Sequence, residues 1–284
     1  MSHNRLLVLA AAVLFSTGGA AIKATTLGAW QVASFRSGVA TLAMIGLVPA
    51  ARRGWTWRVV PVSAAYAATL VLFVLANKLT TAANAIFLQA AAPLYLLLLG
   101  PLLLREPIRR SELLFMSAVA VGLAAFFVGA EKAVVSAPDP LRGKVLAALS
   151  GVTYAGTLAG LRWLGRGVTA GNPAAASVVA GNLIAFLACL PMALPIARAG
   201  TPDLLVILYL GVFQIGLAYL CLTRALRHVP ALTASLLLLA EPALNPVWAW
   251  VVQGERPGPW AVAGGALILT ATAANTWWQS RVTG

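Results

Sequence analysis

The sequence predicts an all-α integral membrane protein with ten transmembrane helices in two inverted five-helix repeats around a central cavity. Composition is the first reason, since 61% of the residues are hydrophobic and only 10% are charged, against roughly 25% charged in a soluble domain. The second is a recurrence of apolar runs of the length that crosses a bilayer, about 20 residues. The third is an internal repeat, in which a segment from the middle of the chain matches one near its end.

Ten apolar runs are separated by short polar gaps. The first, which follows Arg5, has small residues near Ala20 as a signal peptide does, but it continues toward Lys23 and similar runs follow, so we interpret it as a membrane helix. The predicted spans are residues 5–22, 30–50, 59–78, 82–104, 111–130, 144–164, 173–197, 203–223, 231–252 and 259–279.

The longest polar gap, EKAVVSAPDPLRG at residues 131–143, divides five runs from five. Its Pro-Asp-Pro sequence is typical of a linker. We therefore predict a first five-helix half at residues 1–131, a linker at 132–143 and a second half at 144–284.

The distribution of Lys and Arg predicts the orientation. These residues are more numerous in the gaps on the side of Arg5, Arg52 and Arg53 than on the side of Lys23 and Lys78. Since the richer side faces the cytoplasm, both termini are expected to be cytoplasmic, in a bacterial-type inner membrane. Six Trp residues near run ends are expected to anchor in the lipid interface: Trp30, Trp55, Trp57, Trp260, Trp277 and Trp278.

Several function classes lack a sequence basis. The net charge of +13 does not indicate nucleic-acid binding, because the basic residues lie scattered between apolar runs. Cys189 and Cys221 have no paired spacing, and His3 and His228 are far apart, so no metal site is predicted. The sequence has no phosphate-binding loop and no hydrolase motif. We therefore predict no cofactor and no enzyme activity.

The repeat predicts a carrier. Aligning residues 78–107 with 227–256 without gaps pairs Pro93 with Pro242 and Glu106 with Glu255. With an odd number of spans in each half, the second half enters the membrane from the opposite side. Inverted halves of this kind are the architecture of alternating access.

Several segments resemble the EamA-type drug/metabolite transporters. They are GGAAIKA at the end of the first run, ASFRSGVA in the second, the stretch QIGLAYLCLTRALRHVPALTASLLLLAEPALNPVWAWVVQGE, and its first-half counterpart ending in LLLREP. The resemblance covers essentially the whole chain and implies a cavity lined mainly by helices 1, 3, 4, 6, 8 and 9. Within the family, the chain is most similar to bacterial amino-acid exporters of the YddG type.

Glu241 is the main candidate site residue. It lies about 15 Å along its run, at mid-membrane, where a carboxylate is costly and must face protein or water. Pro242 and Pro246 lack amide protons, so the helix is expected to kink and leave carbonyl groups free. One interpretation makes Glu241 a cavity group that contacts an ammonium or takes a coupling proton. The other has it tie the kinked helix to a neighbour through buried hydrogen bonds.

Other polar and aromatic residues inside the runs are candidates for lining the cavity, with packing as the competing interpretation. Thr233, Leu237, Glu241, Asn245 and Trp248 form one helical stripe. Arg36 is interpreted as a buried structural residue or one that snorkels to the interface. Glu255 is interpreted as structural, paired with a nearby Arg such as Arg105 or Arg256. The full set of cavity candidates is Asn77, Asn84, Gln89, Tyr95, Tyr154, Trp163, Gln214, Tyr219, Thr233, Glu241, Asn245 and Trp248.

We therefore expect a secondary transporter in the lipid bilayer that exports small amphipathic metabolites, in first place amino acids including aromatic ones. Amide groups beside aromatic rings suit a small-molecule substrate with a zwitterionic head. Proton coupling is left open. Two alternatives stand beside this expectation: a carrier of another substrate, such as a drug cation or a nucleotide sugar, and a membrane enzyme or scaffold that transports nothing.

Overall fold

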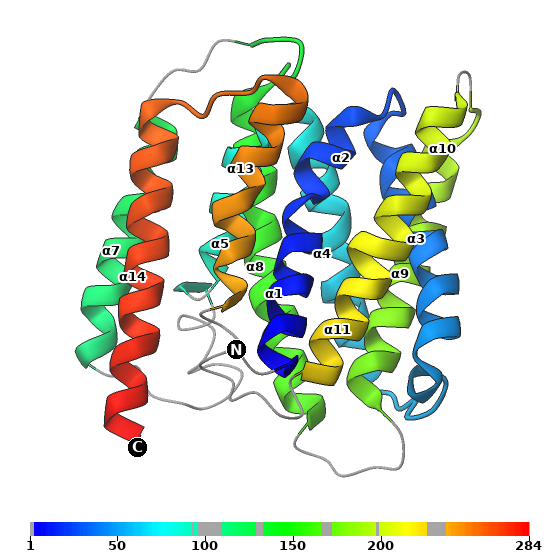
Figure 1. Cartoon of the computed structure of the whole chain (residues 1–284), viewed down its shortest axis with the longest axis horizontal. Coiled ribbons are helices and arrows are strands. Elements are labelled where there is room, and N and C mark those ends of the chain that lie inside the picture. Colours follow the sequence, from blue (N-terminus) through cyan, green and yellow to red (C-terminus); the bar gives the residue numbers. More distant parts are fainter. Residues whose placement is uncertain are drawn as a thin grey trace.

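The computed structural model describes residues 3–92, 94–95, 110–128, 133–165, 172–196, 199–225 and 237–283. These residues form a bundle of helices that run up and down side by side (Figure 1). Within them, paired extended structure is limited to the isolated bridge between Val134 and Ala137. A helix is the natural form of an isolated apolar span, because its backbone groups bond one another without help from water.

The helices follow the chain in the predicted order. Up to residue 128 they are α1 (His3–Ser16), α2 (Gly18–Ala24), α3 (Ala29–Leu47), the 3₁₀ turn η1 (Pro49–Arg52), α4 (Val59–Leu79), α5 (Ala82–Ala90) and α7 (Arg110–Val128). From residue 140 they are α8 (Pro140–Gly165), α9 (Pro173–Ala193), α10 (Thr201–Leu208), the π-helix η2 (Tyr209–Leu217), α11 (Ala218–Ala225), α13 (Ala240–Gln253) and α14 (Pro259–Thr283).

Every predicted run overlaps one or more of these helices, although runs 82–104, 111–130, 173–197 and 231–252 extend beyond the described residues. By length and composition, five helical stretches of the described chain can cross a membrane: His3–Ala24, Val59–Leu79, Pro140–Leu161, Pro173–Ala193 and Thr201–Leu222. The apolar helix Leu113–Val128 is shorter. The chain is thus a multi-pass helical membrane protein.

Local sequence signals set the helix ends. Thr81 caps α5 by accepting a hydrogen bond from the Asn84 amide at 3.2 Å, and Asn172 caps α9 in the same way. Such side-chain oxygens satisfy amide groups that have no partner within the helix. At the other end of a helix, Gly254 ends α13 in the left-handed conformation, with φ of 69°, which a residue without a Cβ adopts readily.

Successive spans alternate in direction, so both ends of the chain lie at the same end of the bundle (Figure 1). We call this the lower end; it holds Leu47 and Val59. The opposite, upper end holds Ala24, Leu79 and Gln253, together with the loop at 133–139. The predicted orientation would make the lower end cytoplasmic.

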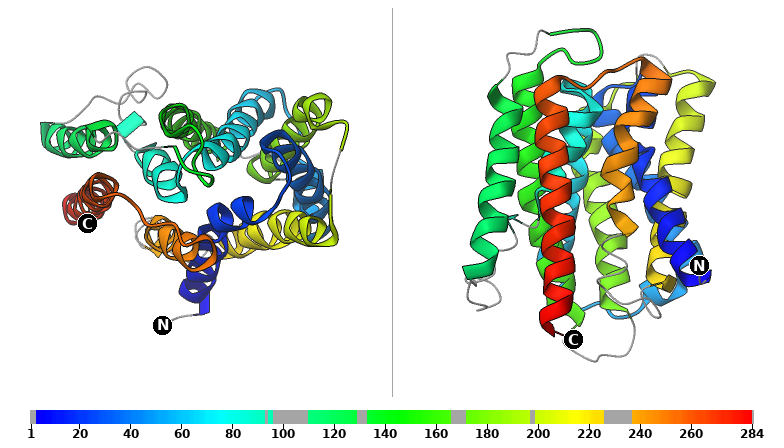
Figure 2. Two further views of the ribbon diagram at one scale, coloured as in Figure 1. Left: turned by 90° about the horizontal axis from the view of Figure 1, so that it is seen from above. Right: turned by 60° about the vertical axis from the view of Figure 1, so that its left-hand side comes forward.

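The main packing contacts join early helices to late ones. Helix α4 lies against α8 and α9, α3 against α9 and η2, and α1 against α11 and α13, while α7 pairs with α14 (Figure 2). Small residues permit this approach, as lipid-embedded interfaces require. A Cβ on Gly160 would lie 2.6 Å from Val62, and one on Gly264 would lie 2.6 Å from the Gly122 carbonyl oxygen.

All six Trp residues predicted to anchor in the interface are exposed. Trp57 also makes an edge contact with Trp163, with ring centroids 5.7 Å apart, and the guanidinium of Arg58 lies over both rings. These residues lie near the lower end, where an amphipathic ring fits the boundary between lipid and water.

Candidate functional site

The ninth predicted span has a turn at Leu239. This residue separates helical residues 237–238 from α13, which begins at Ala240, and its own backbone keeps helical dihedral angles, φ of −62° and ψ of −15°. Glu241 is the second residue of α13.

The Glu241 side chain is half-buried. Within the described part of the chain it has no hydrogen-bond or ion-pair partner, so the predicted buried hydrogen bonds to a neighbouring helix are not found there. It lies within electrostatic range of the hydroxyl groups of Tyr154 on α8 and Tyr219 on α11. Three spans thus place a carboxylate and two phenols near one another.

Aromatic rings extend this group. Tyr219 makes T-shaped contacts with Phe15 of α1, with centroids 5.1 Å apart, and with Tyr66 of α4, at 6.0 Å. Phe15, Tyr154 and Tyr219 are half-buried, whereas Tyr66 is buried. The edge-to-face geometry is the one that aromatic quadrupoles favour, and it holds the Tyr219 ring between two other spans.

Arg36 lies near two of these tyrosines, Tyr66 and Tyr219. Its side chain is only 1% exposed, which rules out snorkeling and confirms the buried interpretation. The Nη2 atom donates a hydrogen bond to the Leu70 carbonyl oxygen at 3.1 Å, and the guanidinium lies within electrostatic range of Tyr66 and Tyr219. Among the described residues, no carboxylate pairs with it.

A second polar group surrounds the kink between α1 and α2. Thr17 separates these helices, and its hydroxyl lies 2.8 Å from that of Tyr209. A Cβ on Gly18 would lie 2.9 Å from Nε2 of Gln214, and one on Gly19 would lie 2.7 Å from Oδ1 of Asn245. The two glycines therefore give two amide side chains room beside the kink.

The amides in this group keep unused hydrogen-bonding capacity. In the described residues, both side-chain polar atoms of buried Asn245 lack a partner, as does Oε1 of Gln214. Buried polar atoms are normally satisfied, so these amides are exceptions in the described interior. Next to them, Trp248 donates from Nε1 to the Ser16 hydroxyl at 2.9 Å, joining α13 to α1.

Two more predicted residues lie between α5 and α8. Gln89 donates from Nε2 to the Ser150 hydroxyl at 2.7 Å, and Ser150 donates to the Thr69 carbonyl oxygen at 3.2 Å. Half-buried Tyr95 lies close to Gly151, where a Cβ would approach its ring within 3.0 Å.

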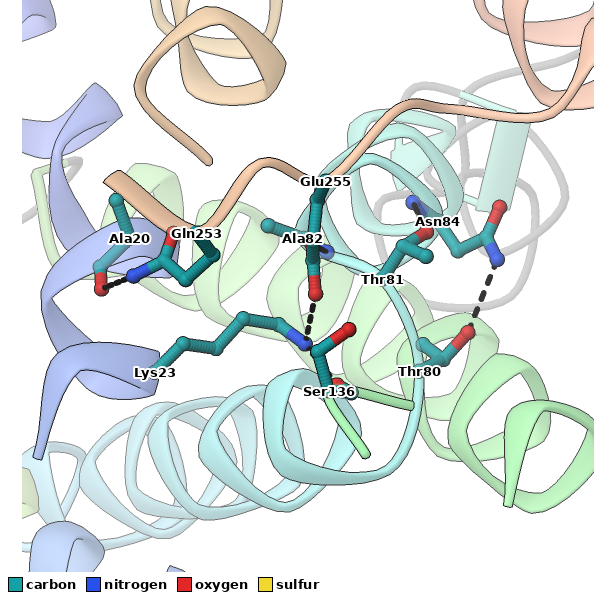
Figure 3. Close-up of polar contacts among 9 residues, drawn as sticks. All are labelled: Ala20, Lys23, Thr80, Thr81, Ala82, Asn84, Ser136, Gln253 and Glu255. Atoms are coloured by element: carbon teal, nitrogen blue, oxygen red, sulfur yellow. Dashed lines mark hydrogen bonds and ion pairs between the residues drawn. The ribbon is translucent and has the colours of Figure 1, made fainter. Parts of the chain in front are cut away.

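The upper end is tied together by an ion pair. Lys23 Nζ lies 2.6 Å from Glu255 Oε1, with both side chains only 5% exposed, and Lys23 also donates to the Ser136 carbonyl oxygen (Figure 3). Glu255 Oε2 accepts a hydrogen bond from the Ala82 amide at 3.0 Å. The structural role predicted for Glu255 is therefore confirmed, but its partner is the distant Lys23, whereas Arg256 is exposed.

Other bonds strengthen the same end. Gln253 donates from Nε2 to the Ala20 carbonyl oxygen at 2.7 Å, again joining α13 to α2 (Figure 3). Asp203 of α10 accepts hydrogen bonds from the Thr25 and Thr26 hydroxyls at 2.6 and 2.8 Å. Lys78 donates to the Thr25 carbonyl oxygen at 2.8 Å.

Three predicted cavity residues lie apart from these groups. Asn77 is buried near the upper end of α4 and donates to the Phe73 carbonyl oxygen at 2.9 Å; Asn84 donates to the Thr80 hydroxyl, also at 2.9 Å. Trp163 belongs to the lower-end cluster with Trp57. Thr233 lies outside the described residues.

Sequence reasoning missed Phe15, Tyr66 as a neighbour of Arg36, and the pairing of Lys23 with Glu255. Phe15 has no distinguishing sequence signal, because one aromatic residue in an apolar run indicates packing. The GG pair at 18–19 is a signal that was available, because adjacent glycines inside a span allow close approach of neighbouring side chains.

Apolar helices that run up and down through the bundle, with a carboxylate in the interior, are typical of a multi-pass membrane protein with a polar pathway. The EamA-like transporter family model matches residues 5–128 and 141–277, so the chain belongs to the EamA-like transporter family. Its members are membrane transporters, which act on small-molecule substrates within the lipid bilayer. The family thus disfavours the alternatives of an enzyme or a scaffold.

The fold is similar to that of a solved structure described only as "Crystal structure of protein". The TM-score is 0.64 at 20% sequence identity, and the match covers 100% of both chains. This likeness concerns the fold alone. No curated protein matches the chain in sequence.

Proposed function

We propose that this transporter is a secondary carrier that exports small amphipathic metabolites, above all amino acids including aromatic ones, by alternating access. The observation that carries the proposal is the half-buried Glu241, which follows the turn at Leu239 and lies within electrostatic range of the Tyr154 and Tyr219 hydroxyls. Ionisable residues inside transmembrane segments typically mark substrate or ion pathways.

Two inverted halves, residues 1–131 and 144–284 joined by the linker 132–143, account for the packing. If the two halves have the same fold, α1 of the first half corresponds to α8 of the second, and α4 and α5 correspond to α11 and α13. The contacts of α1 with α11 and α13 are then equivalent to those of α8 with α4 and α5. The same correspondence maps the pair α7 and α14 onto itself. The turns at Ala91 and Leu239 lie at nearly equivalent positions of the repeat, which also supports this arrangement.

The polar ties at the upper end fit one step of such a cycle. The Lys23–Glu255 pair and the Gln253 bond to Ala20 hold α2 and α13 together. For a substrate to leave through this end, α2 and α13 must separate, so these bonds would break and re-form in every cycle. With both termini in the cytoplasm of a bacterial-type cell, the upper end faces outward, so release through this end is export.

The interior groups favour amino acids over strongly charged metabolites. Amides with unused hydrogen-bonding atoms, such as Asn245 and Gln214, and the rings of Tyr154 and Tyr219 provide polar contacts and apolar surface together. Such a lining suits a substrate with a polar head and a variable side chain. Glu241 then contacts the substrate ammonium or takes a coupling proton.

The direct test is efflux from proteoliposomes that contain the full chain. The vesicles are loaded with labelled amino acids, and efflux is followed with and without a proton gradient. We expect aromatic and aliphatic amino acids to leave faster than from protein-free vesicles. Efflux equal to that from empty vesicles for the whole panel would reject amino-acid transport.

Glu241→Gln tests the role of the carboxylate in the same assay. We expect the variant to fold like the parent and to export more slowly, since the charge is lost while the shape is kept. If efflux continues but no longer responds to the proton gradient, Glu241 is the coupling group. Unchanged efflux with a lower yield of folded protein would assign it a structural role only.

A second substrate class is favoured by one observation. Glu241 lies near Tyr154 and Tyr219, and a carboxylate beside aromatic faces is a suitable site for an organic cation. A drug cation that competes with amino-acid efflux, or that is exported when amino acids are not, would support this alternative.

A further inference from the structure

The linker packs on the upper end of the bundle through its residues 133–139, which we call the linker hairpin. Val134 and Ala137 close it with two backbone hydrogen bonds, of 3.1 and 2.9 Å. Just before α8, the Asp139 amide donates to the Leu79 carbonyl oxygen at the end of α4, at 3.1 Å. Ala137 is only 2% exposed, whereas Val135 at the tip is fully exposed. The hairpin is therefore fixed against the helices on one side.

Lys23 connects the linker hairpin to α2 and to the segment after α13. It is the last residue but one of α2, and its ammonium group contacts both the Ser136 carbonyl oxygen and Glu255 Oε1 (Figure 3). Glu255 in turn accepts a hydrogen bond from the Ala82 amide at the start of α5. Because an ammonium group has three protons to donate, one buried cation joins three segments that are far apart in sequence.

These contacts lie at the end through which the proposed substrate leaves. Lys23 is 5% exposed, so each acceptor that it loses leaves its charge less compensated in an apolar surrounding. The Ser136 carbonyl group and the Glu255 carboxylate therefore stabilise the same arrangement, in which α2 lies against the segment after α13. Opening this end by moving α2 away from α13 would separate Lys23 from at least one of them.

We propose that the linker hairpin is a latch for the upper end. Its Ser136 carbonyl group holds Lys23, and through Lys23 it holds α2 against the segment after α13. When the upper end opens, Lys23 leaves both the hairpin and Glu255. The proposal rests on that part of the proposed function in which the upper end opens and closes, and it gives the linker a role beyond joining the two halves.

A reporter cysteine at Ala82 measures how often the upper end opens. This residue is 0% exposed, and its Cβ lies 3.0 Å from the position that a Cβ on Gly19 would occupy, so it lies between α5 and α2. Cys189 and Cys221 are replaced by alanine, and the rate at which a soluble maleimide modifies Ala82→Cys is followed in the purified full chain. Ala51→Cys, at an equally buried position in η1 at the lower end, is the matched reporter.

Val134→Pro together with Ala137→Pro removes both amide protons that close the hairpin. We expect this double variant to increase the modification rate of Ala82→Cys about tenfold or more, as loss of a hydrogen bond to a charged group requires. The rate at Ala51→Cys should not change. Val135→Ala, at the exposed tip, is the control and should change neither rate. An unchanged rate at Ala82→Cys, or an equal rise at both reporters, would overturn the proposal.

Lys23→Met tests whether the hairpin acts through the lysine. Alone, it should raise the modification rate of Ala82→Cys, since it removes both contacts of the ammonium group. Adding the two proline substitutions should then cause little further increase, because residues in one network do not act independently. A second tenfold increase would show that the hairpin does not act through Lys23, and the latch would be rejected.

Hydrogen exchange carries the test if the proline variant does not fold. Coupling between two groups is reciprocal, so the loss of Lys23 must loosen the hairpin. In Lys23→Met, segment 133–139 should exchange about tenfold faster than in the parent, as the loss of one hydrogen bond to a charged group requires. Segment 56–60 at the lower end, where the Val59 amide donates to the Thr56 carbonyl oxygen, should keep its rate. Unchanged exchange at 133–139 would overturn the proposal.

These measurements need no substrate, so they are separate from the efflux test of the proposed function. If no amino acid leaves the vesicles but labelling and exchange follow the expectation, amino-acid transport is rejected and the latch stands. If amino acids are exported while labelling and exchange stay unchanged, only the latch is rejected.

Discussion

At the scale of single residues, the buried polar contacts lie where separate parts of the chain meet. Lys23 and Glu255 are both 5% exposed, and they join the end of α2 to the loop after α13. A buried pair costs desolvation when it forms, yet breaking it leaves a lone charge in an apolar surrounding. The effect of changing one partner should therefore exceed the net contribution of the pair.

A double-mutant cycle of Lys23 and Glu255 tests this expectation. Lys23→Met should lower the free energy of unfolding by about 3–5 kcal/mol, because it leaves Glu255 unpaired. Glu255→Gln should also destabilise, while keeping an acceptor for the Ala82 amide. The double variant should lose less than the sum of the two. Unfolding in mixed micelles measures all three.

Arg256→Gln is the control for this cycle. The side chain is exposed and follows Glu255 directly, so its loss should change stability by less than about 0.5 kcal/mol. Strictly additive effects of the two single changes would show that Lys23 and Glu255 do not interact energetically.

The sequence predicts which polar residues have a structural role better than it predicts the partners of those residues. Glu255 is identifiable as structural from its place at a span end, but the partner expected from proximity was a neighbouring Arg. Lys23 precedes it by more than two hundred residues. A single sequence has no local signal for such a pairing, because the two residues are brought together only by the packing of whole helices.

At the scale of elements, proline position explains the ninth span only in part. A kink was predicted at Pro242 and Pro246; the structure has a one-residue turn at Leu239 and a helix, α13, that contains both prolines, with Pro242 as its third residue. In a first helical turn the missing amide proton costs little, since that amide has no intrahelical acceptor. Pro246 does lie inside the helix.

The π-helix η2 was not predictable from the local pattern. Residues 209–217 are mostly apolar, with Gln214 among them, and no proline marks the wide turn. Helix α3 lies close to this segment: a Cβ on Gly211 would approach Val39 within 2.5 Å and the Arg36 carbonyl oxygen within 2.9 Å. Such π segments frequently occur at functional sites.

Gly264→Ala tests the close packing of α7 and α14. The new Cβ would lie 2.6 Å from the Gly122 carbonyl oxygen and 2.8 Å from the Phe126 ring. Because backbone on the partner helix cannot move aside locally, the helices must separate. We expect a loss of about 1–3 kcal/mol in the free energy of unfolding.

Gly46→Ala is the matched substitution. Gly46 lies in α3, and a Cβ there would meet nothing within 4 Å. Its stability should stay equal to that of the parent or rise by up to about 1 kcal/mol, because alanine is the better helix former. If the two alanine variants have the same free energy of unfolding, close packing at Gly264 does not stabilise the α7–α14 pair.

At the scale of the whole molecule, length, hydropathy and gap composition were enough to predict a multi-pass helical membrane protein and the order of its helices in the described chain. They were not enough to predict that each half packs mainly against the other, which depends on the shapes of helix surfaces. Charge distribution predicts the orientation, and the shared position of both termini at the lower end is consistent with it (Figure 1).

Cysteine labelling in intact cells checks this orientation. In a background with Cys189 and Cys221 replaced by alanine, Val135→Cys lies in the exposed upper loop and Arg53→Cys in the exposed lower one. We expect a membrane-impermeant maleimide to label Val135→Cys in intact cells, and Arg53→Cys only after permeabilisation. The opposite pattern would place the termini outside and reverse the proposed direction.

The interleaved packing also bears on biosynthesis. Helices α1, α3, α4 and α7 find their main partners among α8 to α14, which leave the ribosome later. While the nascent chain is still growing, the contact faces of these early segments must therefore be covered by lipid or by the insertion machinery. Assembly completes only when the final segments are released, so a translational arrest shortly before α13 would leave α1 without α13 and α7 without α14.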